Sequence, residues 1–349
     1  MRLMQIQLSQ AEAGAETYFE KVASAFAQDK SITQRLVIEA LPGREARLQA
    51  ANVEFDTLPI GAISRPLFYH WKLRRAVLKF NPDIIFTWQN RASKYCPQMG
   101  APIVGRLGGY YNLAKYTKCE HLVVNTPDLV RHVVEHNWDP NRVTMISNFG
   151  ELPTSLQVPQ QIPNIPNDHT LLLALGRLHE KKAHDTLIKA MPYIPKATLL
   201  IAGSGDLEKE LKDLASDLGV ADRVIFLGLR KDIDDLFQQA DICVFPSRFE
   251  PLGNVILEAW ATETPLVSAA SQGPSWLVEH ETNGLLFPVD DHKACAKEVN
   301  RLILNDGALR EKLIANGLRK FQEQHSMDAI INQYKALFQK LLTIKKTQM

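Results

Sequence analysis

The sequence lacks the features that mark membrane, secreted and disulfide-rich proteins. No apolar run reaches the roughly 18 residues that a transmembrane helix requires. The four cysteines are scattered, without the paired spacing of a disulfide framework or a zinc site. Residues 1–8 lack the long apolar core of a signal peptide and are typical of a first strand. We therefore expect a cytoplasmic protein that contains neither disulfides nor a metal.

The chain also lacks the residue groups of several common catalytic and metal sites. No Ser/His/Asp or Cys/His constellation can be argued from it. His132 and His136 have the spacing of metal ligands on a helix, but no third ligand accompanies them, which favours a surface helix. Asp232 and Asp234 begin a predicted helix, where carboxylates cap free N–H groups and favour the dipole. Helix capping is therefore favoured over a metal site there.

Acidic residues are scarce in one part of the chain. Residues 61–118 contain ten Lys or Arg residues and a single acid, Asp83, although the whole chain carries a net charge of only +1. Such a block suggests a polyanionic partner or an anionic membrane surface. Within it, residues 64–79 are both basic and aromatic. This segment either packs on the core with a solvated face or rests on lipid headgroups.

The length and the alternation of elements predict two α/β domains. A chain of 349 residues exceeds one ordinary core. Strands alternate with helices in both halves, which indicates βαβ units and parallel sheets. Residues 151–169 carry four prolines among polar residues and form the best linker. We place one domain at 1–155 and the other at 165–328, and expect the amphipathic helix in 329–349 to pack back on the first.

Apolar runs and turn residues indicate the individual elements. In the first domain the predicted strands are 2–8, 36–39, 84–87, 103–104, 121–125 and 143–146, and the predicted helices are 15–28 and 71–80. In the second domain the predicted strands are 171–175, 197–202, 224–227, 241–245 and 265–268, and the predicted helices are 185–191, 207–218, 233–239 and 254–261. Gly219 is a plausible residue to end the helix before it.

Two carboxylates in the second domain bracket a loop that leads into a helix. The strand at 241–245 delivers Glu250 to a Pro-Leu-Gly-Asn turn, and Glu258 lies inside the helix that follows. Ligands of open α/β sheets bind outside the carboxyl ends of the strands, and a helix N-terminus there suits a phosphate. Glu250 and Glu258 can accept hydrogen bonds from hydroxyl groups on either side. A nucleotide that bears a sugar requires this arrangement, whereas the simpler alternative is a helix with solvated acids.

A basic loop follows the first strand of the same domain. Arg177 offers a planar fork of donors and Lys182 a point charge, and both follow Gly176 at a strand's carboxyl end. A diphosphate would need neutralising at this position. Basic residues in loops are more often solvated, but the glycine directly after the strand favours a site.

Glycines follow the next two strands. Gly203 and Gly205 resemble the opening of a dinucleotide fingerprint, but Glu208 replaces its third glycine. A tight turn into a helix explains this pair equally well. Arg230 follows Gly228 in the same row of loops, and the backbone there could meet a nucleobase.

A glycine also opens the first long helix of the chain. Gly14 permits close backbone approach, and the helix N-terminus that includes Ala15 can face an anion. An ordinary helix start would have much the same sequence. Both interpretations therefore stay open for this segment.

Taken together and in order, these motifs resemble the retaining glycosyltransferases of family 4, which have the GT-B fold. The residues that carry the resemblance are Gly176-Arg-Leu…Lys182, Gly203-Ser-Gly205, Phe226-Leu-Gly228, Glu250…Glu258 and Asn283-Gly-Leu-Leu-Phe-Pro288, with weaker support from Gly14-Ala-Glu16, Asn125-Thr126 and Ile146-Ser-Asn148. The resemblance implies two Rossmann-like domains facing a central cleft. It also implies that a nucleoside-diphosphate sugar binds mainly to the second domain.

The resemblance further implies a role for each site residue. Arg177 and Lys182 would contact the diphosphate and stabilise the departing nucleotide, while Glu258 would bind ribose and Glu250 the donor sugar. The backbone N–H groups would hold the phosphates or the sugar at Leu252, Gly253 and Asn254. The acceptor hydroxyl would attack from the leaving-group face, with the diphosphate taking its proton. Neither a metal nor another cofactor is expected.

The resemblance leaves one departure and three functional hypotheses. Many relatives carry a histidine in the loop that here contains Leu107-Gly-Gly-Tyr-Tyr111, so the backbone or Tyr110 would have to orient the sugar or acceptor instead. We expect a glycosyltransferase at the inner membrane face that acts on a glycolipid or polysaccharide of the lipopolysaccharide type, with no nucleic-acid partner. The alternatives are a nucleotide-sugar-binding regulator or subunit, and a sugar-nucleotide isomerase.

Overall fold

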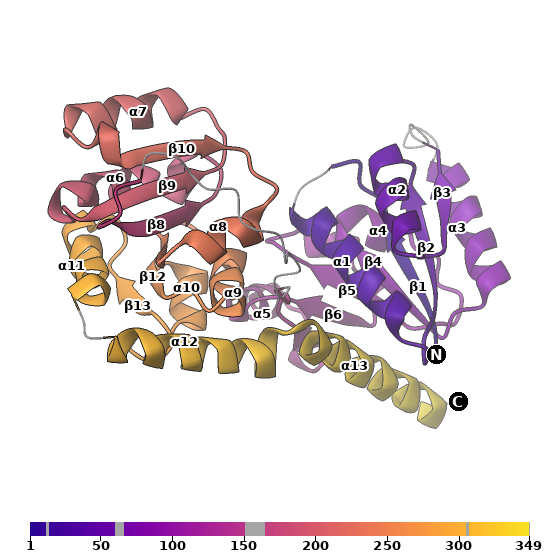
Figure 1. Ribbon diagram of the computed structural model, residues 1–349. Helices are drawn as coiled ribbons and strands as arrows, with labels where there is room; N and C mark the ends of the chain where they lie inside the picture. The colour runs from indigo at the N-terminus through magenta and orange to yellow at the C-terminus, as the bar shows by residue number, and fades with distance from the viewer. Residues whose placement is uncertain (12–13, 60–65, 151–164, 305–306, 349) are drawn as a thin grey trace. The chain divides into compact units, whose positions relative to one another are not determined.

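The chain forms two parallel α/β sheets, each in its own compact unit. The computed structural model describes residues 1–11, 14–59, 66–150, 165–304 and 307–348 (Figure 1). Unit 1 comprises Met1–Asn148 together with Met327–Met349, and unit 2 comprises Phe149–Ser326. The two sheets confirm the predicted α/β class. Of the predicted linker at 151–169, residues 151–164 lie outside the described part of the chain.

Unit 1 is built on a seven-stranded sheet with the order β3-β2-β1-β4-β5-β6-β7, in which all neighbours are parallel. Its strands are β1 (Arg2–Gln7), β2 (Thr33–Glu39), β3 (Phe55–Leu58), β4 (Ile84–Trp88), β5 (Ile103–Leu107), β6 (His121–Val124) and β7 (Val143–Met145). Its helices are α1 (Gly14–Gln28), α2 (Pro42–Ala50), α3 (Pro66–Phe80), α4 (Gln89–Tyr95), α5 (Pro127–Glu135) and α13 (Met327–Gln348). The central strands are buried along nearly their whole length because helices cover both faces.

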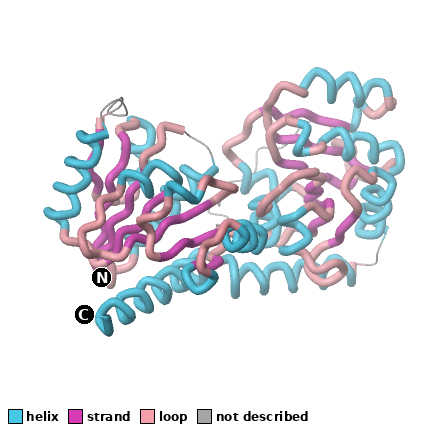
Figure 2. Tube along the Cα trace, turned by 180° about the vertical axis from the view of Figure 1, so that it is seen from behind, coloured by secondary structure: helices cyan, strands magenta, loops and turns pink. Residues whose placement is uncertain are grey.

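Helix α13 returns to unit 1 after the whole of unit 2 has been traversed. Tyr334 and Phe338 are buried, and their rings lie 5.4 and 5.5 Å from the ring of Phe86 on β4. The ammonium of Lys335 donates to the carboxylate of Asp29, 2.5 Å away, just after α1. Figure 2 shows α13 as the long helix that ends at the C-terminus, and this helix contacts α1. Helix α13 thus belongs to the same compact unit as Met1–Asn148, and the domain bounds expected from the sequence stay a prediction.

Unit 2 is built on a six-stranded parallel sheet with the order β10-β9-β8-β11-β12-β13. Its strands are β8 (Thr170–Leu175), β9 (Ala197–Ala202), β10 (Val224–Gly228), β11 (Ile242–Phe245), β12 (Leu266–Ala269) and β13 (Leu285–Phe287). Its helices are α6 (His184–Ala190), α7 (Glu208–Asp217), α8 (Ile233–Gln239), α9 (Asn254–Ala261), α10 (Gln272–Leu277), α11 (His292–Leu304) and α12 (Ala308–Lys320).

Successive residues of β8 point to opposite cores of unit 2. Leu172 and Ala174 pack with apolar residues of α6, α7 and α11, whereas Leu171 and Leu173 pack with those of α8 and α9. Figure 1 shows these helices on the two sides of the sheet. The strand therefore has to be apolar from Leu171 to Leu175, which is why its sequence is a continuous run instead of an alternation. Burial of both faces fixes the carboxyl edge of the sheet, where the candidate site lies.

Candidate functional site

The predicted site residues of unit 2 gather where the strand order reverses. The chain winds from β8 outward to β10, and then continues on the other side of β8 with β11. The crevice outside the carboxyl ends of two such strands is the usual ligand site of an open parallel sheet. The loop after β8 carries Arg177 and Lys182, and the loop after β11 carries Glu250. The fold therefore brings both basic residues and the first glutamate to one edge.

A cavity of about 450 Å³ opens at this edge. Arg177, Gly203, Arg230 and Glu258 all line it, so four of the predicted residues share one concave surface. Its remaining wall is largely apolar and was not predicted from the sequence; it includes Leu229, Ile233 and Val255. The sequence does contain an apolar residue at the start of each of α8 and α9. Helical periodicity assigns such residues to the packed side of a helix, so they were not predicted to line a cavity. An apolar wall beside polar groups suits a flat, partly polar ligand.

Lys182 and Glu250 form an ion pair across the crevice. The Lys182 ammonium donates to a carboxylate oxygen of Glu250, and the two side chains are only 29% and 15% exposed. The same ammonium lies 5.5 Å from the centre of the Phe245 ring. Partial burial weakens solvent screening, so the pair holds both side chains in place. The two residues that the sequence assigned to different parts of a ligand are thus direct partners.

Arg248 ties together the two loops that carry this ion pair. Its guanidinium donates to the Asp185 carboxylate at 2.8 Å and to the Asp290 carboxylate at 2.5 Å. It also donates to the Glu180 carbonyl at 2.8 Å, while the Arg248 backbone N–H donates to the carbonyl of Lys181 at 2.9 Å. A fork of charge-assisted bonds fixes direction as well as distance. Arg248 was not predicted, because its partners lie 42 and 63 positions away in sequence.

The glycines at 203 and 205 are explained by packing between loops. A Cβ atom at Gly203 would lie 1.9 Å from the Gly176 carbonyl oxygen, and one at Gly205 would lie 2.3 Å from that of Leu178. Backbone hydrogen bonds join these loops, since Leu178 N–H donates to Ser204 at 3.0 Å and Gly203 N–H donates to Gly228 at 2.8 Å. The close approach requires glycine. A direct role of these two glycines in ligand binding stays a prediction.

A glycine also sets the start of α9. Gly253 precedes the helix with φ +95°, a left-handed conformation that favours glycine, and Asn254 is the first helical residue. The buried Leu252 packs against α10, where a Cβ at Gly273 would lie 2.3 Å from the Leu252 carbonyl. Gly273 N–H donates to the Glu250 carbonyl at 2.8 Å. The first turn of α9 is thus held at the crevice, where helix N–H groups suit an anion.

Residues 159–320 match the family described as Glycosyl transferases group 1. Over 331 residues the chain is 32% identical to the lipopolysaccharide core biosynthesis glycosyltransferase LpsE of Rhizobium meliloti, covering 93% of this chain and 95% of that protein. The chain belongs to the group 1 glycosyltransferases. This membership confirms the predicted family and the predicted enzyme class.

Two further comparisons support the family and the fold of this glycosyltransferase. It is 31% identical over 344 residues to the lipopolysaccharide core biosynthesis glycosyltransferase LpsD of Rhizobium meliloti, covering 97% of this chain and 98% of that protein. The crystal structure of Anabaena Alr3699/HepE in complex with UDP and glucose superposes with a TM-score of 0.77 at 19% identity, covering 97% of this chain and 100% of that one. The structural likeness confirms the predicted GT-B fold.

The predicted capping of α8 by the Asp232 side chain is wrong, whereas Asp234 lies in the first turn of α8, where an acid favours the helix dipole. Asp232 stands at the N-cap of α8, but its side chain makes no capping hydrogen bond. Its carboxylate instead accepts from the Arg230 guanidinium, with 2.7 Å between Nε and Oδ1, and this contact lowers the pKa of Asp232 to about 2. Arg230 is the stronger partner because it offers two charged donors. The arginine that lines the cavity is therefore oriented by the aspartate two residues on.

The predicted residues at the start of α1 lie in unit 1. Gly14 is exposed, with open space around the position of a Cβ atom, so no packing requirement explains it. Ala15 follows it in the first turn of α1. Glu16 is buried and accepts hydrogen bonds from Ser9 at 2.7 Å and from Gln89 at 2.8 Å. A donor contact by Gly14 or Ala15 stays a prediction.

The two candidate histidines and the four cysteines do not gather into a metal site within the described residues. His132 lies on α5 and His136 directly follows that helix, with ring centres 4.3 Å apart. Within the described part of the chain, no group of three or more His, Cys, Asp or Glu residues could hold a metal ion. The four cysteines are buried and unpaired. In the loop that lacks the family's histidine, the Tyr110 hydroxyl donates to Asp128.

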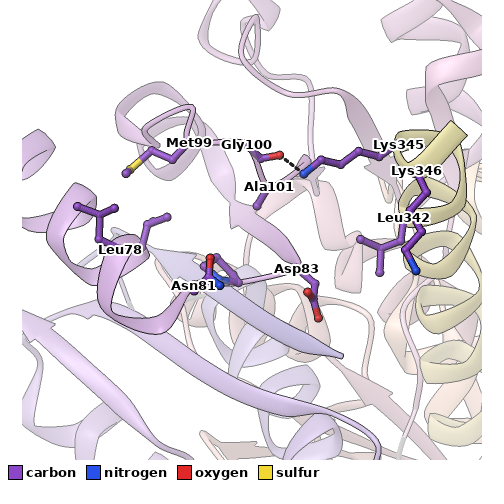
Figure 3. A pocket seen from close by; sticks show the side chains of 11 residues that line it. Leu78, Asn81, Asp83, Met99, Gly100, Ala101, Leu342, Lys345 and Lys346 are labelled. Atoms are coloured by element: carbon purple, nitrogen blue, oxygen red, sulfur yellow. Dashed lines mark hydrogen bonds between the residues drawn. The ribbon is translucent and has the colours of Figure 1, made fainter. Parts of the chain in front are cut away.

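A second cavity of the glycosyltransferase contains none of the predicted site residues. It lies in unit 1, has a volume of about 380 Å³, and opens beside Asp83 and Ala101, which precede β4 and β5 (Figure 3). Lys345 of α13 points across it and donates to the Gly100 carbonyl. This is the amino edge of the sheet, opposite the edge where parallel α/β sheets bind their ligands. Its position gives it no part in the predicted site.

Proposed function

We propose that this glycosyltransferase moves a sugar, with retention of anomeric configuration, from a nucleoside-diphosphate sugar to a glycolipid or polysaccharide of the lipopolysaccharide core type. LpsE and LpsD are lipopolysaccharide core biosynthesis glycosyltransferases that match nearly the whole chain, which supports the acceptor class. Anabaena Alr3699/HepE was crystallised in complex with UDP and glucose, which supports a nucleotide-sugar donor. The single observation that carries the proposal is the crevice of unit 2, where basic and acidic side chains lie beside an apolar wall.

The crevice offers a separate surface for each part of such a donor. The cavity between Leu229, Ile233 and Val255 provides an apolar wall for a nucleobase, and Glu258 at its edge provides an acceptor for ribose hydroxyls. Arg177, whose side chain is 68% exposed, can turn toward a diphosphate. The loop at Leu252, Gly253 and Asn254 and the start of α9 add backbone N–H groups. Glu250 lies beside Lys182, where the sugar would join the diphosphate.

Charge development explains how these residues would accelerate transfer. Breaking the anomeric C–O bond leaves the diphosphate with additional negative charge. Lys182 and Arg177 would interact more strongly with that charge than with the intact donor, which lowers the barrier. The attacking acceptor hydroxyl loses its proton to a leaving diphosphate oxygen on the same face. In this scheme the two glutamates bind hydroxyl groups and orient the donor, and no proton transfer to them is required.

The ion pair of the free enzyme has a place in this scheme. Glu250 holds Lys182 at the crevice before the donor arrives. A diphosphate that approaches Lys182 would share the ammonium with Glu250, since an ammonium has three donor hydrogens. The lysine therefore needs little reorganisation when the leaving-group charge develops. We propose this prior orientation as the main role of the Lys182–Glu250 pair.

An anionic membrane surface is the proposed place of action. Trp71, which is 52% exposed, lies on one face of α3 with Arg74 and Arg75, whereas Leu73 and Val77 on the opposite face are buried. A helix with exposed cations and an exposed indole suits the interface of an anionic bilayer. Among the helices that the structure describes, none combines the length and apolar character that a membrane span needs. Peripheral contact is therefore the proposed mode of attachment.

Replacing Lys182 tests the donor site. Lys182→Ala should lower kcat at least about tenfold, because it removes a charged contact to the leaving group. The neighbouring Lys181 is exposed and its ammonium lies over the Phe249 ring, 5.1 Å from the centre, so Lys181→Ala is the matched control. Both variants are assayed for transfer and for melting temperature. Equal turnover in Lys182→Ala and wild type would show that the donor site has been misplaced.

A ligand screen identifies the nucleotide that the assay needs. A nucleoside diphosphate that binds only the folded chain raises the melting temperature, by an amount that grows with concentration over Kd. UDP, GDP, ADP and CDP are compared at equal concentrations, with Glu258→Ala as the variant that loses the ribose contact. The proposal expects one or two of them to raise the melting temperature of the wild type and to lose most of that effect in Glu258→Ala. It fails if no nucleotide raises the melting temperature.

A further inference from the structure

Unit 1 has a cavity at its own reversal of strand order. In its sheet the order β3-β2-β1-β4 turns back between β1 and β4. A cavity of about 340 Å³ opens at the carboxyl ends of these strands, lined by Ser9 after β1, by Gln89 after β4 and by Tyr111 after β5. This is the same position in the fold that the candidate donor site occupies in unit 2. The cavity belongs to unit 1 alone.

The lining of this cavity carries an excess of positive charge. Arg91, Lys94 and Lys115 all contribute to it. Arg91 pairs with the buried Glu39 at 3.1 Å. Within the described residues neither Lys94 nor Lys115 forms an ion pair with a carboxylate; the Lys94 ammonium lies 5.4 Å from the centre of the Tyr95 ring. Two cations at the cavity therefore lack a charged partner.

Two acids that contact the lining residues already have partners. Glu39 accepts from the Tyr69 hydroxyl at 3.0 Å as well as from Arg91. Glu16 accepts from Ser9 at 2.7 Å and from Gln89 at 2.8 Å. Both carboxylates are almost completely buried, so they orient the lining and leave the two lysines uncompensated. A ligand that satisfies Lys94 and Lys115 has to bring negative charge.

Two local features indicate that this cavity is a binding site. Gln89 has φ +63°, a left-handed backbone conformation. Residues other than glycine rarely adopt it, and it tends to occur at binding sites. This turn aims its amide at Glu16. The next residue, Asn90, lines the cavity with a buried Oδ1 atom that has no hydrogen-bond partner in the described part of the chain. A buried polar atom without a partner is costly unless a ligand or water satisfies it.

We propose that this cavity binds a phosphate or carboxylate group carried by the saccharide acceptor, with Lys94 and Lys115 as its charged contacts. The inference rests on the proposed transferase function and narrows its acceptor to an anionic sugar. The hydroxyls of Tyr95 and Tyr111 and the amide of Asn90 would bind the sugar hydroxyls beside the anion. A neutral sugar would leave both ammonium groups without a partner.

Direct binding of small anionic sugars tests the assignment. The probes are glucose 6-phosphate, glucuronate and glucose, titrated into the full chain with the donor site filled by the nucleoside diphosphate identified above. Wild type should bind at least one anionic sugar and show no comparable binding of glucose. Lys94→Gln/Lys115→Gln should bind that anionic sugar at least about tenfold more weakly, and Lys94→Arg/Lys115→Arg should restore most of the affinity. Preference for phosphate or carboxylate then identifies the source of the anion.

The control keeps the failure of the inference distinct from failure of the proposed function. Lys30→Gln removes an exposed charge of unit 1 away from the cavity and should bind the sugars as wild type does. Nucleotide binding should be the same in wild type and in Lys94→Gln/Lys115→Gln. Equal sugar binding by wild type and the double glutamine variant, or equal binding of glucose and its anionic analogues, overturns the inference. If the wild type itself binds no nucleotide, the proposed donor site is overturned instead.

Discussion

Lys182 and Glu250 illustrate how a site residue depends on its neighbours. Each has a role toward the donor in the proposed mechanism, yet in the free protein each is the other's partner. Arg248 sets the distance between them by joining their loops to Asp185 and Asp290. Loss of one residue in this group therefore changes the position of the others. Transition-state stabilisation of this kind requires positions that are fixed before the donor binds.

His184 provides a test at the residue scale. Burial lowers the pKa of His184 from 6.5 to about 4. Between these values the unfolded chain binds a proton that the folded chain does not, so stability is lost as pH falls from 6.5 toward 4. His184→Gln should remove this dependence. The wild type should therefore lose about 2 kcal/mol more of its unfolding free energy than His184→Gln between pH 7 and pH 5, measured by urea unfolding.

The comparison with the variant separates His184 from all other titrating groups. Carboxylates and the remaining histidines contribute equally to both proteins, so only the difference between the two pH curves matters. Parallel curves would mean that the imidazole is as easily protonated in the folded chain as in the unfolded one. In that case the His184 imidazole would not be held neutral by burial in the folded chain.

Residue chemistry predicted part of the site, and long-range contacts account for the rest. Arg177, Lys182 and Glu250 could be placed at one edge because each follows a recognisable strand, and all parallel strands end on the same side. The Lys182–Glu250 pair and the Arg248 contacts could not be predicted, because they join residues more than 40 positions apart. Side-chain pairing across loops leaves no periodic pattern in a sequence.

At the scale of elements, the loops of unit 2 hold one another. Backbone hydrogen bonds connect the loops after β8 and β9 with each other and with the end of β10, and glycines at 203 and 205 permit the approach. The sequence suggested a nucleotide fingerprint or a tight turn for these glycines. The observed reason is mutual contact between neighbouring loops. The same contact places Gly203 and Arg177 on one cavity wall.

Replacing Gly205 tests this arrangement. The Cβ of Gly205→Ala would come within 2.3 Å of the Leu178 carbonyl oxygen, so one of the two loops has to move. We expect the melting temperature to fall by several degrees, which corresponds to about 1–3 kcal/mol of overpacking, and nucleotide affinity to fall with it. Differential scanning fluorimetry and calorimetric titration measure both effects.

Gly14→Ala is the matched control for the stability effect of that substitution. A Cβ at Gly14 meets nothing within 4 Å, and the residue begins a helix, where alanine is favoured. Its melting temperature should equal or exceed that of the wild type. If Gly205→Ala has the stability of Gly14→Ala and the nucleotide affinity of the wild type, the loops have more freedom than the close contacts indicate.

Element prediction succeeded where burial is two-sided and failed for some short or partly exposed elements. The strands β8 and β9 and the helices α8 and α9 were placed within a residue or two, because continuous apolar runs and helical periodicity mark them. The strand β3, at the edge of its sheet, was missed because Phe55-Asp-Thr-Leu58 is mostly half-exposed and polar at its centre. The helix α2 was missed because Pro42-Gly-Arg resembles a turn.

At the scale of the whole molecule, the basic surface of α3 should direct the enzyme to anionic membranes. Arg74→Glu/Arg75→Glu reverses two exposed charges beside Trp71. Binding to phosphatidylglycerol vesicles in low salt should weaken at least about tenfold, because each basic residue near an anionic surface contributes about 1 kcal/mol. Cosedimentation at several salt concentrations measures the effect.

The control for membrane binding lies in unit 2. Lys209→Glu/Lys212→Glu reverses two exposed charges on α7, where they pair with acids one turn away. This variant should bind vesicles as the wild type does. Vesicle binding that does not depend on salt concentration and is equal in the wild type and both variants would refute an electrostatic contact by α3.

The return of α13 to unit 1 has a consequence for biosynthesis. All of unit 2 is synthesised before Tyr334 and Phe338, which contact Phe86 and Phe26 of unit 1. Until then the aromatic face of unit 1 stays uncovered, even though most of that unit was synthesised first. Domains ordinarily complete in the order of synthesis, and uncovered apolar surface favours aggregation. In this enzyme the whole of unit 2 is therefore synthesised before unit 1 receives the helix that covers its aromatic face.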